Sequence, residues 1–279
     1  MSVTSSSAGR KRPVALTIAG SDSSGGAGIE ADLKTFEAHG VWGTAAITAV
    51  TAQNTLGVQA VETLAPEMVR AQIASVVADL GVDAAKTGML ATAEVIESVA
   101  ATVTQLGVVP LVVDPVMVAS TGSRLLDPDA VQAVCDLLLP RAAVVTPNLA
   151  EAATLTGLEV VDRDGMERAV RALADMGPGA VLVKGGHLSG DTSPDCLLVP
   201  GEDPVWLDGP RLPAHGAHGS GCVLSAAICA ELARGMEPAD ACVAAKRFVE
   251  RAIAAGPLLG EGVVPVEPGW AARQHDGLP

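Results

Sequence analysis

Short apolar segments alternate with longer segments of helical periodicity along most of the chain. Strands are predicted at the apolar segments 14–19, 44–51, 111–113, 144–145, 181–183 and 196–199. Helices are predicted where apolar residues recur every three or four positions, at 31–39, 66–80, 92–106, 127–139, 166–176, 222–234 and 238–255. Strands that are almost wholly apolar and separated by helices indicate an α/β fold, with a mostly parallel sheet covered by helices on both faces.

Residues typical of helix ends support these boundaries. Pro66 stands at a first helical position, and Thr92 can accept a hydrogen bond from the first turn of the helix that follows it. Gly40, Gly81 and Gly107 follow the ends of three helices, where glycine is favoured. Residues 1–12 are predicted as a flexible N-terminal tail, 13–265 as a single domain and 266–279 as a C-terminal tail.

The composition indicates a folded domain with an acidic balance of charge. Of the 279 residues 49% are hydrophobic, and the glycines follow no three-residue period, which excludes disordered and fibrous proteins. Lys and Arg number 18 against 32 Asp and Glu, for a formal net charge of -14. Nucleic acid and anionic membranes repel such a chain, so neither is expected as a partner. A small anionic ligand needs only a local cluster of N–H groups and stays possible.

The cysteines and the apolar segments favour a cytoplasmic protein. The five cysteines are odd in number and include no C-x-x-C pair, which argues against a disulfide framework and against zinc. A basic triplet at 10–12 precedes the first apolar segment, but that segment is too short for a secretory signal. The longest uncharged stretches are interrupted by Gly, Thr, Gln or Pro, so no transmembrane helix is expected.

The glycine-rich loop 20–28 follows the first strand, and the ends of parallel strands are where ligands bind. The loop superficially matches a dinucleotide-binding fingerprint, but no acidic residue follows at the spacing that would bind a ribose. A Walker A loop is absent, because Gly-Lys occurs nowhere in the chain. The glycines therefore favour close approach of the backbone to a different ligand over a merely flexible turn.

A second glycine-rich loop, 215–222, runs directly into an apolar helix. Residues 219–221 can turn several N–H groups toward one point at the positive end of that helix, where they would hold an anion. Cys222 would lie in the same field, where the pKa of a thiol is expected to fall. His215 and His218 are interpreted as loop residues without a catalytic role.

Carboxylates and a lysine stand at the ends of other strands. Asp114 ends the strand 111–113, and Lys184 follows the strand 181–183 beside a glycine turn. Asn148 and Glu151 begin a helix with the spacing of a capping box, which is compatible with a water-mediated magnesium contact. A lone lysine in such a loop is usually solvated. Together the groups favour phosphoryl transfer, which needs mainly positioning and charge neutralisation, and they identify no substrate.

Ten short motifs cover the predicted domain. They are TIAGSD (17–22), GGAGI (25–29), ADLKTF (31–36), ITA (47–49), AQNT (52–55), KTGML (86–90), VDPVM (113–117), TPNLAEA (146–152), KGGH (184–187) and HGSGC (218–222). In order and spacing the chain resembles hydroxymethylpyrimidine/phosphomethylpyrimidine kinase of thiamine biosynthesis from residue 13 to 265. The resemblance implies a ribokinase-like, three-layer α-β-α sandwich and a homodimer.

The resemblance also implies an activity and a set of site residues. The activity is the ATP-dependent phosphorylation of 4-amino-5-hydroxymethyl-2-methylpyrimidine and then of its monophosphate. Gln53 would pair with the aminopyrimidine edge, because a primary amide offers a donor and an acceptor side by side. The other implied roles are substrate binding by Ala27, Thr51, Met89 and Asp32, an anion hole of Gly219, Ser220 and Gly221, base catalysis by Cys222, ATP binding by Lys184 and Asn148, and Mg²⁺ binding by Asp114 and Glu151.

Three positions depart from the pattern of the family. Glu30 stands where Gln is expected, Trp42 where Tyr is usual, and Ser120 where Lys often precedes the Ser/Thr-Gly pair. The first two are expected near the rim of the pocket, whereas Ser120 removes a possible phosphate contact for the second phosphorylation. With no Tyr and two Phe, recognition through amide hydrogen bonds and aliphatic or Met contacts is expected more than stacking, and Trp42 is the one ring to check against the pyrimidine.

Two other functions stay open at this point. A pyridoxal or pyridoxine kinase of the same superfamily would also bind a ring that carries a hydroxymethyl group, although Gln53 favours the aminopyrimidine. A non-catalytic pyrimidine or nucleotide sensor would keep the fold but need not retain Asp114, Glu151, Lys184 and Cys222 together.

Overall fold

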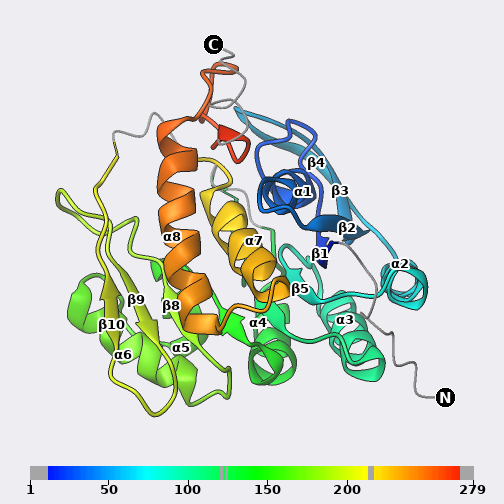
Figure 1. Ribbon diagram of the computed structural model, residues 1–279, viewed down its shortest axis with the longest axis horizontal. Helices are drawn as coiled ribbons and strands as arrows, with labels where there is room; N and C mark the ends of the chain where they lie inside the picture. Colours follow the sequence, from blue (N-terminus) through cyan, green and yellow to red (C-terminus); the bar gives the residue numbers. More distant parts are fainter. Residues whose placement is uncertain (1–11, 120–121, 123–124, 213–216, 271–279) are drawn as a thin grey trace.

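The computed structural model describes residues 12–119, 122, 125–212 and 217–270. The strands of its main sheet are β1 (Val14–Ala19), β2 (Trp42–Ile47), β5 (Ala84–Thr87), β6 (Leu111–Val113), β7 (Val144–Val145), β8 (Val181–Val183), β9 (Asp195–Leu198) and β10 (Val205–Leu207). Their order is β10-β9-β8-β7-β6-β5-β1-β2 (Figure 1). All neighbours from β2 to β8 run parallel, and β9 and β10 are added as antiparallel strands. The predicted, mostly parallel sheet is confirmed.

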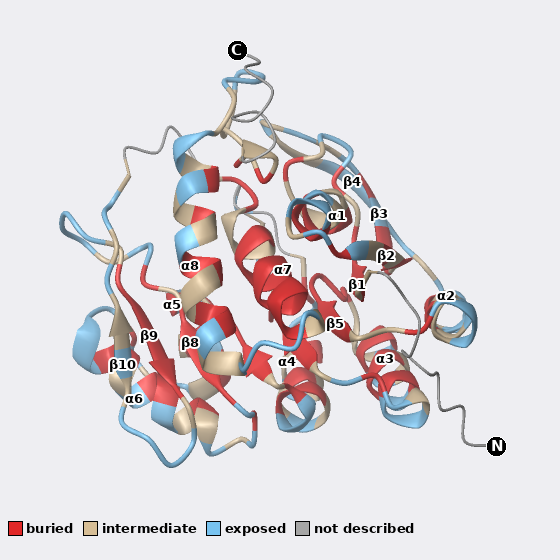
Figure 2. Ribbon diagram, in the orientation of Figure 1, coloured by how far each residue is buried: buried red, intermediate tan, exposed pale blue. Residues whose placement is uncertain are grey.

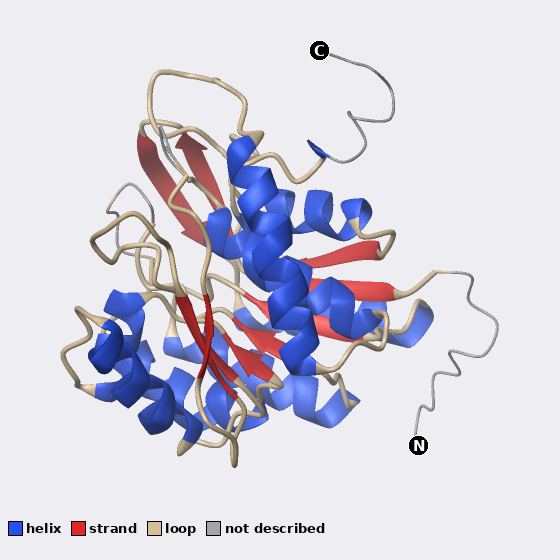
Figure 3. Cartoon of the chain, turned by 60° about the vertical axis from the view of Figure 1, so that its left-hand side comes forward, coloured by secondary structure: helices blue, strands red, loops and turns tan. Residues whose placement is uncertain are grey.

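Helices cover both faces of this sheet, which confirms the three-layer sandwich (Figure 3). One face carries α2 (Pro66–Asp79), α3 (Ala93–Leu106), α4 (Ala130–Ala133), α5 (Leu149–Thr156) and α6 (Arg163–Ala174). The other face carries α1 (Gly28–Ala38), α7 (Ser220–Ala233) and α8 (Pro238–Ala254). Successive side chains of a strand point to opposite faces, so the core has two parts. In β6, Leu111 and Val113 pack on the first face and Val112 on the second.

Helix α7 is the most deeply buried of the helices, as its colour in Figure 2 shows. Apolar or small side chains surround its axis, and ten consecutive residues from Val223 to Leu232 are buried. Helix α8 covers its outer side with one apolar face and exposes the other. A helix that is apolar all round belongs in a core, so the N-terminus of α7 is held firmly where it meets the sheet.

The structure corrects the predicted strand 44–51, which is two strands in two sheets. Strand β2 ends at Ile47, and β3 (Ala49–Asn54) pairs antiparallel with β4 (Gly57–Thr63) in a separate two-stranded sheet. Thr48 separates them, since its amide donates to the carbonyl of Ala19 and its buried hydroxyl donates to the carbonyl of Met89. Because the chain turns at Thr48, β3 does not continue the pairing of β2 with β1, and the carbonyl of Ala49 accepts the N–H of Ser21 just beyond β1.

Three further strands and one helix also differ from the prediction. Strand β5 reads Ala-Ala-Lys-Thr, β4 is exposed, and β10 has three residues of which the first is exposed, so none of them has the apolar pattern of a buried strand. The predicted helix 127–139 is broken into α4, a π-helical turn (Val134–Leu138) and a 3-10 turn (Leu139–Arg141). Val266, in the predicted C-terminal tail, is buried against the second face.

Parallel strands deliver their loops to one edge of the sheet. The segments that follow β1, β5, β6, β7 and β8 begin with Gly20, Gly88, Asp114, Thr146 and Lys184. Backbone hydrogen bonds tie these segments together, from Asp114 to Thr87, from Thr146 to Val113 and from Lys184 to Pro147. The residues singled out in the sequence therefore come from distant parts of the chain to one surface.

Candidate active site

A cavity of about 510 Å³ lies at the carboxyl edge of the sheet. It brings together most of the residues that the sequence suggested. Those that line it are Ala27, Gln53, Met89, Asp114, Asn148, Glu151, Lys184, Gly219, Ser220, Gly221 and Cys222. The two remaining suggestions, Thr51 and Asp32, are not among the lining residues.

Thr51 and Asp32 contact residues that line the cavity, namely Ser21 and Lys86. The hydroxyl of Thr51 donates to the carbonyl of Ser21 at 2.8 Å, which joins β3 to the loop after β1. Asp32 is fully buried on α1 and accepts hydrogen bonds from Thr17 at 2.6 Å and from the ammonium of Lys86 at 2.9 Å. Burial alone would lower the pKa of Lys86, but Asp32 raises it well above its ordinary value, so the lysine stays charged.

The N-terminus of α7 forms one wall of the cavity. Gly219 has a φ of 82°, and a Cβ at this position would lie 1.9 Å from the carbonyl oxygen of Gly26. Only glycine lets the two glycine-rich loops approach so closely. A Cβ on Gly221 would lie 3.2 Å from Nζ of Lys184, so the start of α7 opens toward that cation. A helix start and a lysine therefore lie side by side, which suits an anion, although the N–H of Ser220 already donates to the carbonyl of Ala217 at 3.0 Å.

The thiol of Cys222 lies at the same helix start, but the expectation of a lowered pKa is wrong. Burial raises the pKa of Cys222 to about 11, against the opposing effect of the Lys86 ammonium. Asp32 and Asp114 raise it further, because their negative charges disfavour a thiolate nearby. In the ligand-free protein Cys222 is therefore a neutral thiol at pH 7.

Lys184 is bound between two buried carboxylates. Its Nζ lies 3.0 Å from Oδ1 of Asp114 and 4.0 Å from Oε2 of Glu151. Asp114 also accepts hydrogen bonds from Thr146 at 3.3 Å and from Ser225 of α7 at 3.0 Å. Burial works against the charge of Lys184, yet the two carboxylates raise its pKa above the ordinary value. The lysine is thus a fixed cation rather than a solvated loop residue.

Glu151 caps helix α5 and has a raised pKa. It completes the capping box of α5, in which its carboxylate accepts the N–H of Asn148 at 2.7 Å and the side chain of Asn148 accepts the N–H of Glu151 at 2.9 Å. Burial raises the pKa of Glu151 to about 7, and the charge of Asp114 adds to this while Lys184 opposes it. The carboxyl group can therefore gain or lose a proton near neutral pH.

The donor set around Lys184 fits a magnesium ion that is shared with phosphates. In the part of the chain that the structure describes, no cluster of three or more His, Cys, Asp and Glu side chains could form an all-protein metal cage. Mg²⁺ usually keeps several waters and takes one or two carboxylates together with substrate phosphates. Asp114 and Glu151 supply two such carboxylates at the cavity wall.

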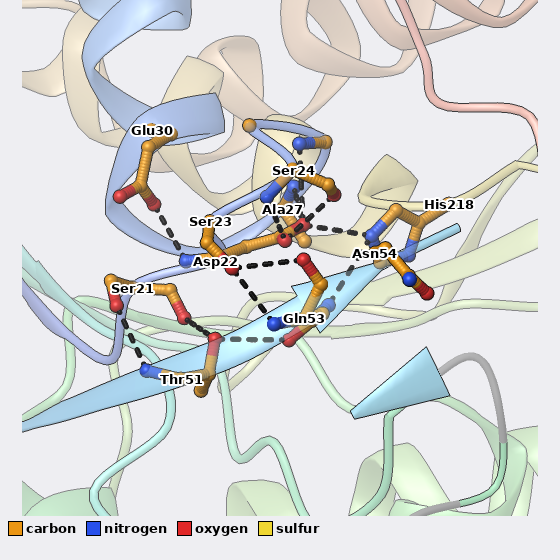
Figure 4. Close-up of polar contacts among 12 residues, drawn as sticks. Ser21, Asp22, Ser23, Ser24, Ala27, Glu30, Thr51, Gln53, Asn54 and His218 are labelled. Carbon is orange, nitrogen blue, oxygen red and sulfur yellow. Dashed lines mark hydrogen bonds and ion pairs between the residues drawn. The ribbon is translucent and has the colours of Figure 1, made fainter. Parts of the chain in front are cut away.

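Asp22 and His218 are the main residues that the sequence analysis did not select. Both line the cavity, and Nε2 of His218 lies 2.9 Å from the carboxylate of Asp22 (Figure 4). His218 was interpreted as a surface loop residue, but its side chain is buried. Asp22 could have been selected because it is a charged residue within the glycine-rich loop 20–28. The loop was interpreted only through its backbone N–H groups, so this side chain was not considered.

A second missed group lies in the same cavity. Lys246 of α8 bonds to the carboxylate of Asp195 at 3.0 Å and donates to the carbonyl of Ser193 at 2.6 Å. Arg211 donates to the carbonyls of several loop residues, including Gly186 at 2.9 Å. Neither basic residue follows a strand of the parallel sheet, so only the fold brings Lys246 and Arg211 to the cavity.

The three positions that depart from the family pattern have different surroundings. Glu30 accepts the N–H of Asp22 at 2.7 Å and holds the first loop. Trp42 is 52% exposed with Arg12 over its ring and does not line the cavity, so the expectation that it lies near the rim of the pocket is wrong. Ser120, like His215, lies outside the described residues.

This arrangement is that of a ribokinase-like kinase, which transfers a phosphoryl group to a small molecule. A family model for phosphomethylpyrimidine kinase matches residues 22–267. The hydroxymethylpyrimidine/phosphomethylpyrimidine kinases of Streptomyces coelicolor and Rhizobium meliloti are 50% and 51% identical to this chain, over 93% and 91% of it and 95% and 96% of their own lengths. The chain belongs to the phosphomethylpyrimidine kinase family.

Solved structures agree with this assignment. A pyridoxal kinase from Staphylococcus aureus in complex with ADP matches with a TM-score of 0.88 at 37% identity, over 95% of this chain and 96% of that one. A phosphomethylpyrimidine kinase from Clostridium difficile matches with a TM-score of 0.76 at 40% identity, over 87% of this chain and 100% of that one. Among the described residues no helix is long and apolar enough to cross a bilayer.

The proton of Glu151 predicts a pH-dependent stability. Because the folded protein holds this proton more tightly than the unfolded chain, the group contributes a loss of stability as pH rises from about 5 through about 7. Glu151→Gln keeps an acceptor for Asn148 and removes the titration. The variant is expected to lose less stability than the wild type between pH 5 and pH 8, measured by urea unfolding at each pH.

The matched control is Glu97→Gln, which changes an exposed glutamate on α3. Glu97→Gln shows the effect of losing an exposed glutamate, so the difference between the two variants reports on Glu151 together with Lys184 and Asp114, to which its charge is coupled. Parallel stability curves for wild type and Glu151→Gln would contradict a raised pKa at this position.

Proposed function

We propose that the protein phosphorylates 4-amino-5-hydroxymethyl-2-methylpyrimidine with ATP and then phosphorylates the monophosphate to the diphosphate, in thiamine biosynthesis. The observation that carries the proposal is the shared cavity, in which Gln53 and the N-terminus of α7 line one space. The relatives from Streptomyces coelicolor and Rhizobium meliloti are named for both activities. Both activities need one ring site beside one phosphoryl site, because the two acceptors differ only by a phosphate.

Gln53 is the proposed anchor for the ring. With the described residues its side-chain amide makes only long contacts, 3.4 Å from its oxygen to the hydroxyl of Thr51 and 3.5 Å from its nitrogen to Nε2 of His218 (Figure 4). An amide held this weakly can pair with a ring nitrogen and its exocyclic amine. Met89 and Ala27 line the same cavity and would contact the ring's faces and methyl group.

The transferring phosphoryl group would be held at the start of α7. In the proposal the N–H groups of residues 219–221 and the ammonium of Lys184 neutralise its charge, and Asn148 binds ATP beside them. Asp114 and Glu151 would hold Mg²⁺, which would offset the negative charge of the ATP phosphates. The pyridoxal kinase complexes with ADP and with AMP-PCP support nucleotide binding by this fold.

Cys222 is the proposed base toward the hydroxymethyl group. Its thiolate would accept the hydroxyl proton as the hydroxymethyl oxygen bonds to the γ-phosphorus of ATP and the bond from that phosphorus to the bridging oxygen breaks, which releases ADP. The neutral thiol would then return the proton to water. Because the thiol pKa is about 11 without ligands, the thiolate is the minor form at neutral pH. The first phosphorylation should therefore speed up with rising pH, whereas a phosphate acceptor already carries its charge and gains nothing from the thiolate.

We also propose a cytoplasmic homodimer. Apolar side chains on the edge of the molecule support a contact between two copies, since Val50, Leu56 and Val61 of the β3–β4 segment are 48%, 65% and 43% exposed.

The choice of acceptor is the direct test of this function. A coupled ADP-release assay would compare the aminopyrimidine, its monophosphate, pyridoxal and pyridoxine. We expect turnover of the first two to exceed that of the others, because Gln53 matches an aminopyrimidine edge. Turnover of pyridoxal alone would contradict the proposal in favour of a pyridoxal kinase. Binding without turnover of any acceptor would indicate a sensor.

Cys222→Ala is expected to slow the first phosphorylation more than the second. The loss in the first step should be about 10²-fold, the usual size of a general-base contribution. Cys222→Ser is the matched control for volume, and it should share the defect because a hydroxyl is a far weaker acid than a thiol. ADP release is measured with each acceptor from pH 7 to pH 9. Equal losses with both acceptors would remove the general-base role.

A further inference from the structure

The carboxylate of Asp22 is the centre of the first glycine-rich loop. It is 1% exposed and receives five hydrogen bonds (Figure 4). Oδ1 accepts from the amide and the hydroxyl of Ser24 at 2.9 and 2.7 Å. Oδ2 accepts from the amides of Gly26 and Ala27 at 3.2 and 2.9 Å and from Nε2 of His218 at 2.9 Å. One carboxylate thus fixes a loop that would otherwise be flexible.

The state of this pair follows from its surroundings. Burial acts to raise the pKa of Asp22, but the hydrogen bonds from His218 and Ser24 outweigh it and lower the pKa to about 2. An ionised carboxylate only accepts hydrogen bonds, so Nε2 of His218 must carry a proton. With that proton in place, the 3.5 Å contact between His218 and the amide nitrogen of Gln53 joins two donors and binds neither.

His218 also ties the first loop to the anion site at α7. It directly precedes Gly219, and its backbone is held on both sides, by the carbonyl of Val264 and the amide of Val266, each at 3.1 Å. A Cβ on Gly26 would lie 2.7 Å from Cδ2 of His218, so the two loops are in direct contact. Asp22 is the only charged side chain within the loop 20–28, and it meets the side chain of the residue next to the anion site.

We propose that the Asp22–His218 contact is a positioning device, which sets the distance between the acceptor's hydroxymethyl group and the phosphoryl group at α7. This inference rests on the proposed function for the identity of the acceptor. Asp22 orders Ala27 and its neighbours around the ring, and His218 orders Gly219 and the N–H groups that follow it. Neither side chain exchanges a proton with the acceptor, because the His218 proton is already committed to Asp22. Both are therefore positioning residues, and loss of the contact affects alignment and not acid–base chemistry.

The test compares two substitutions of His218 that differ in reach. In His218→Gln the amide nitrogen takes the place of Nε2 and can still donate to Asp22. In His218→Asn the shorter amide takes the place of Nδ1 and leaves Asp22 without this donor. We expect His218→Asn to lower kcat by about 10- to 100-fold, the size of effect that a displacement of about 1 Å produces. His218→Gln should restore most of the wild-type kcat.

Two readouts separate positioning from other roles. The KM for ATP should change little, because Lys184 remains and the backbone of residue 218 is still held by Val264 and Val266. The loss in kcat should be equal for the aminopyrimidine and its monophosphate, unlike the unequal loss expected for Cys222→Ala. A loss confined to the first step, or equal defects in His218→Gln and His218→Asn, would overturn the proposal. So would wild-type kcat in His218→Asn.

The wild-type protein distinguishes this proposal from the proposed function. If it turns over only pyridoxal, the proposed acceptor is wrong, and the same two variants test the contact with pyridoxal instead. Long-range ¹H–¹⁵N NMR of the wild-type histidine rings tests it without any acceptor and without a variant that must be active. We expect a protonated Nε2 for His218, assigned by the absence of its signals in His218→Gln. A neutral ring protonated on Nδ1 would overturn the proposal.

Discussion

The direction of the strands is the constraint on which the site depends. Because β1, β5, β6, β7 and β8 run parallel, the segments that follow them all leave from one edge of the sheet. Helix α7 packs on the second face of the sheet, and its N-terminus lies at the same edge. No single loop among the described residues holds all the groups of the candidate site. The sheet brings a glycine-rich loop, a lysine, two carboxylates and a helix start to one cavity.

Charge at this edge is organised by pairing buried groups. The chain carries a formal charge of -14, yet two lysines stay charged inside it, because Lys86 contacts Asp32 and Lys184 contacts Asp114. An uncompensated charge would be costly to bury, so each carboxylate fixes both the place and the charge of its lysine. This explains how an acidic protein presents positive charge to a phosphate at one point. Burial also keeps Cys222 a neutral thiol at pH 7.

Much of the fold could be predicted from the sequence, and the reasons for the exceptions are physical. The apolar strands and capped helices have strong local patterns, so β1, β6 and α3 agree with the prediction. Strand β5 carries Lys86, which is buried in a pair with Asp32, and the chain leaves the main sheet at Thr48 before β3 begins. No local pattern of apolar and polar residues indicates either feature. At the site, glycines and carboxylates at strand ends were recognisable by position. The burial of His218 against Asp22 was not, because the two residues are 196 positions apart.

Two predictions about single residues were wrong, the lowered pKa of Cys222 and the position of Trp42. A thiol at a helix start was expected to have a lowered pKa, but the helix field is only one of several influences, and burial is stronger here. Trp42 was the ring to check for contact with the pyrimidine. It lies at the start of β2, whereas the cavity lies at the carboxyl ends of the strands. Both errors arise because burial and direction depend on the whole fold.

A structure of the protein with the aminopyrimidine and a non-hydrolysable ATP analogue would test the central claim most directly. The account predicts that the ring pairs with Gln53, that its hydroxymethyl oxygen faces Cys222, and that the terminal phosphate contacts the N–H groups of residues 219–221 and Lys184. A terminal phosphate bound away from the start of α7, or a ring bound without Gln53, would contradict it.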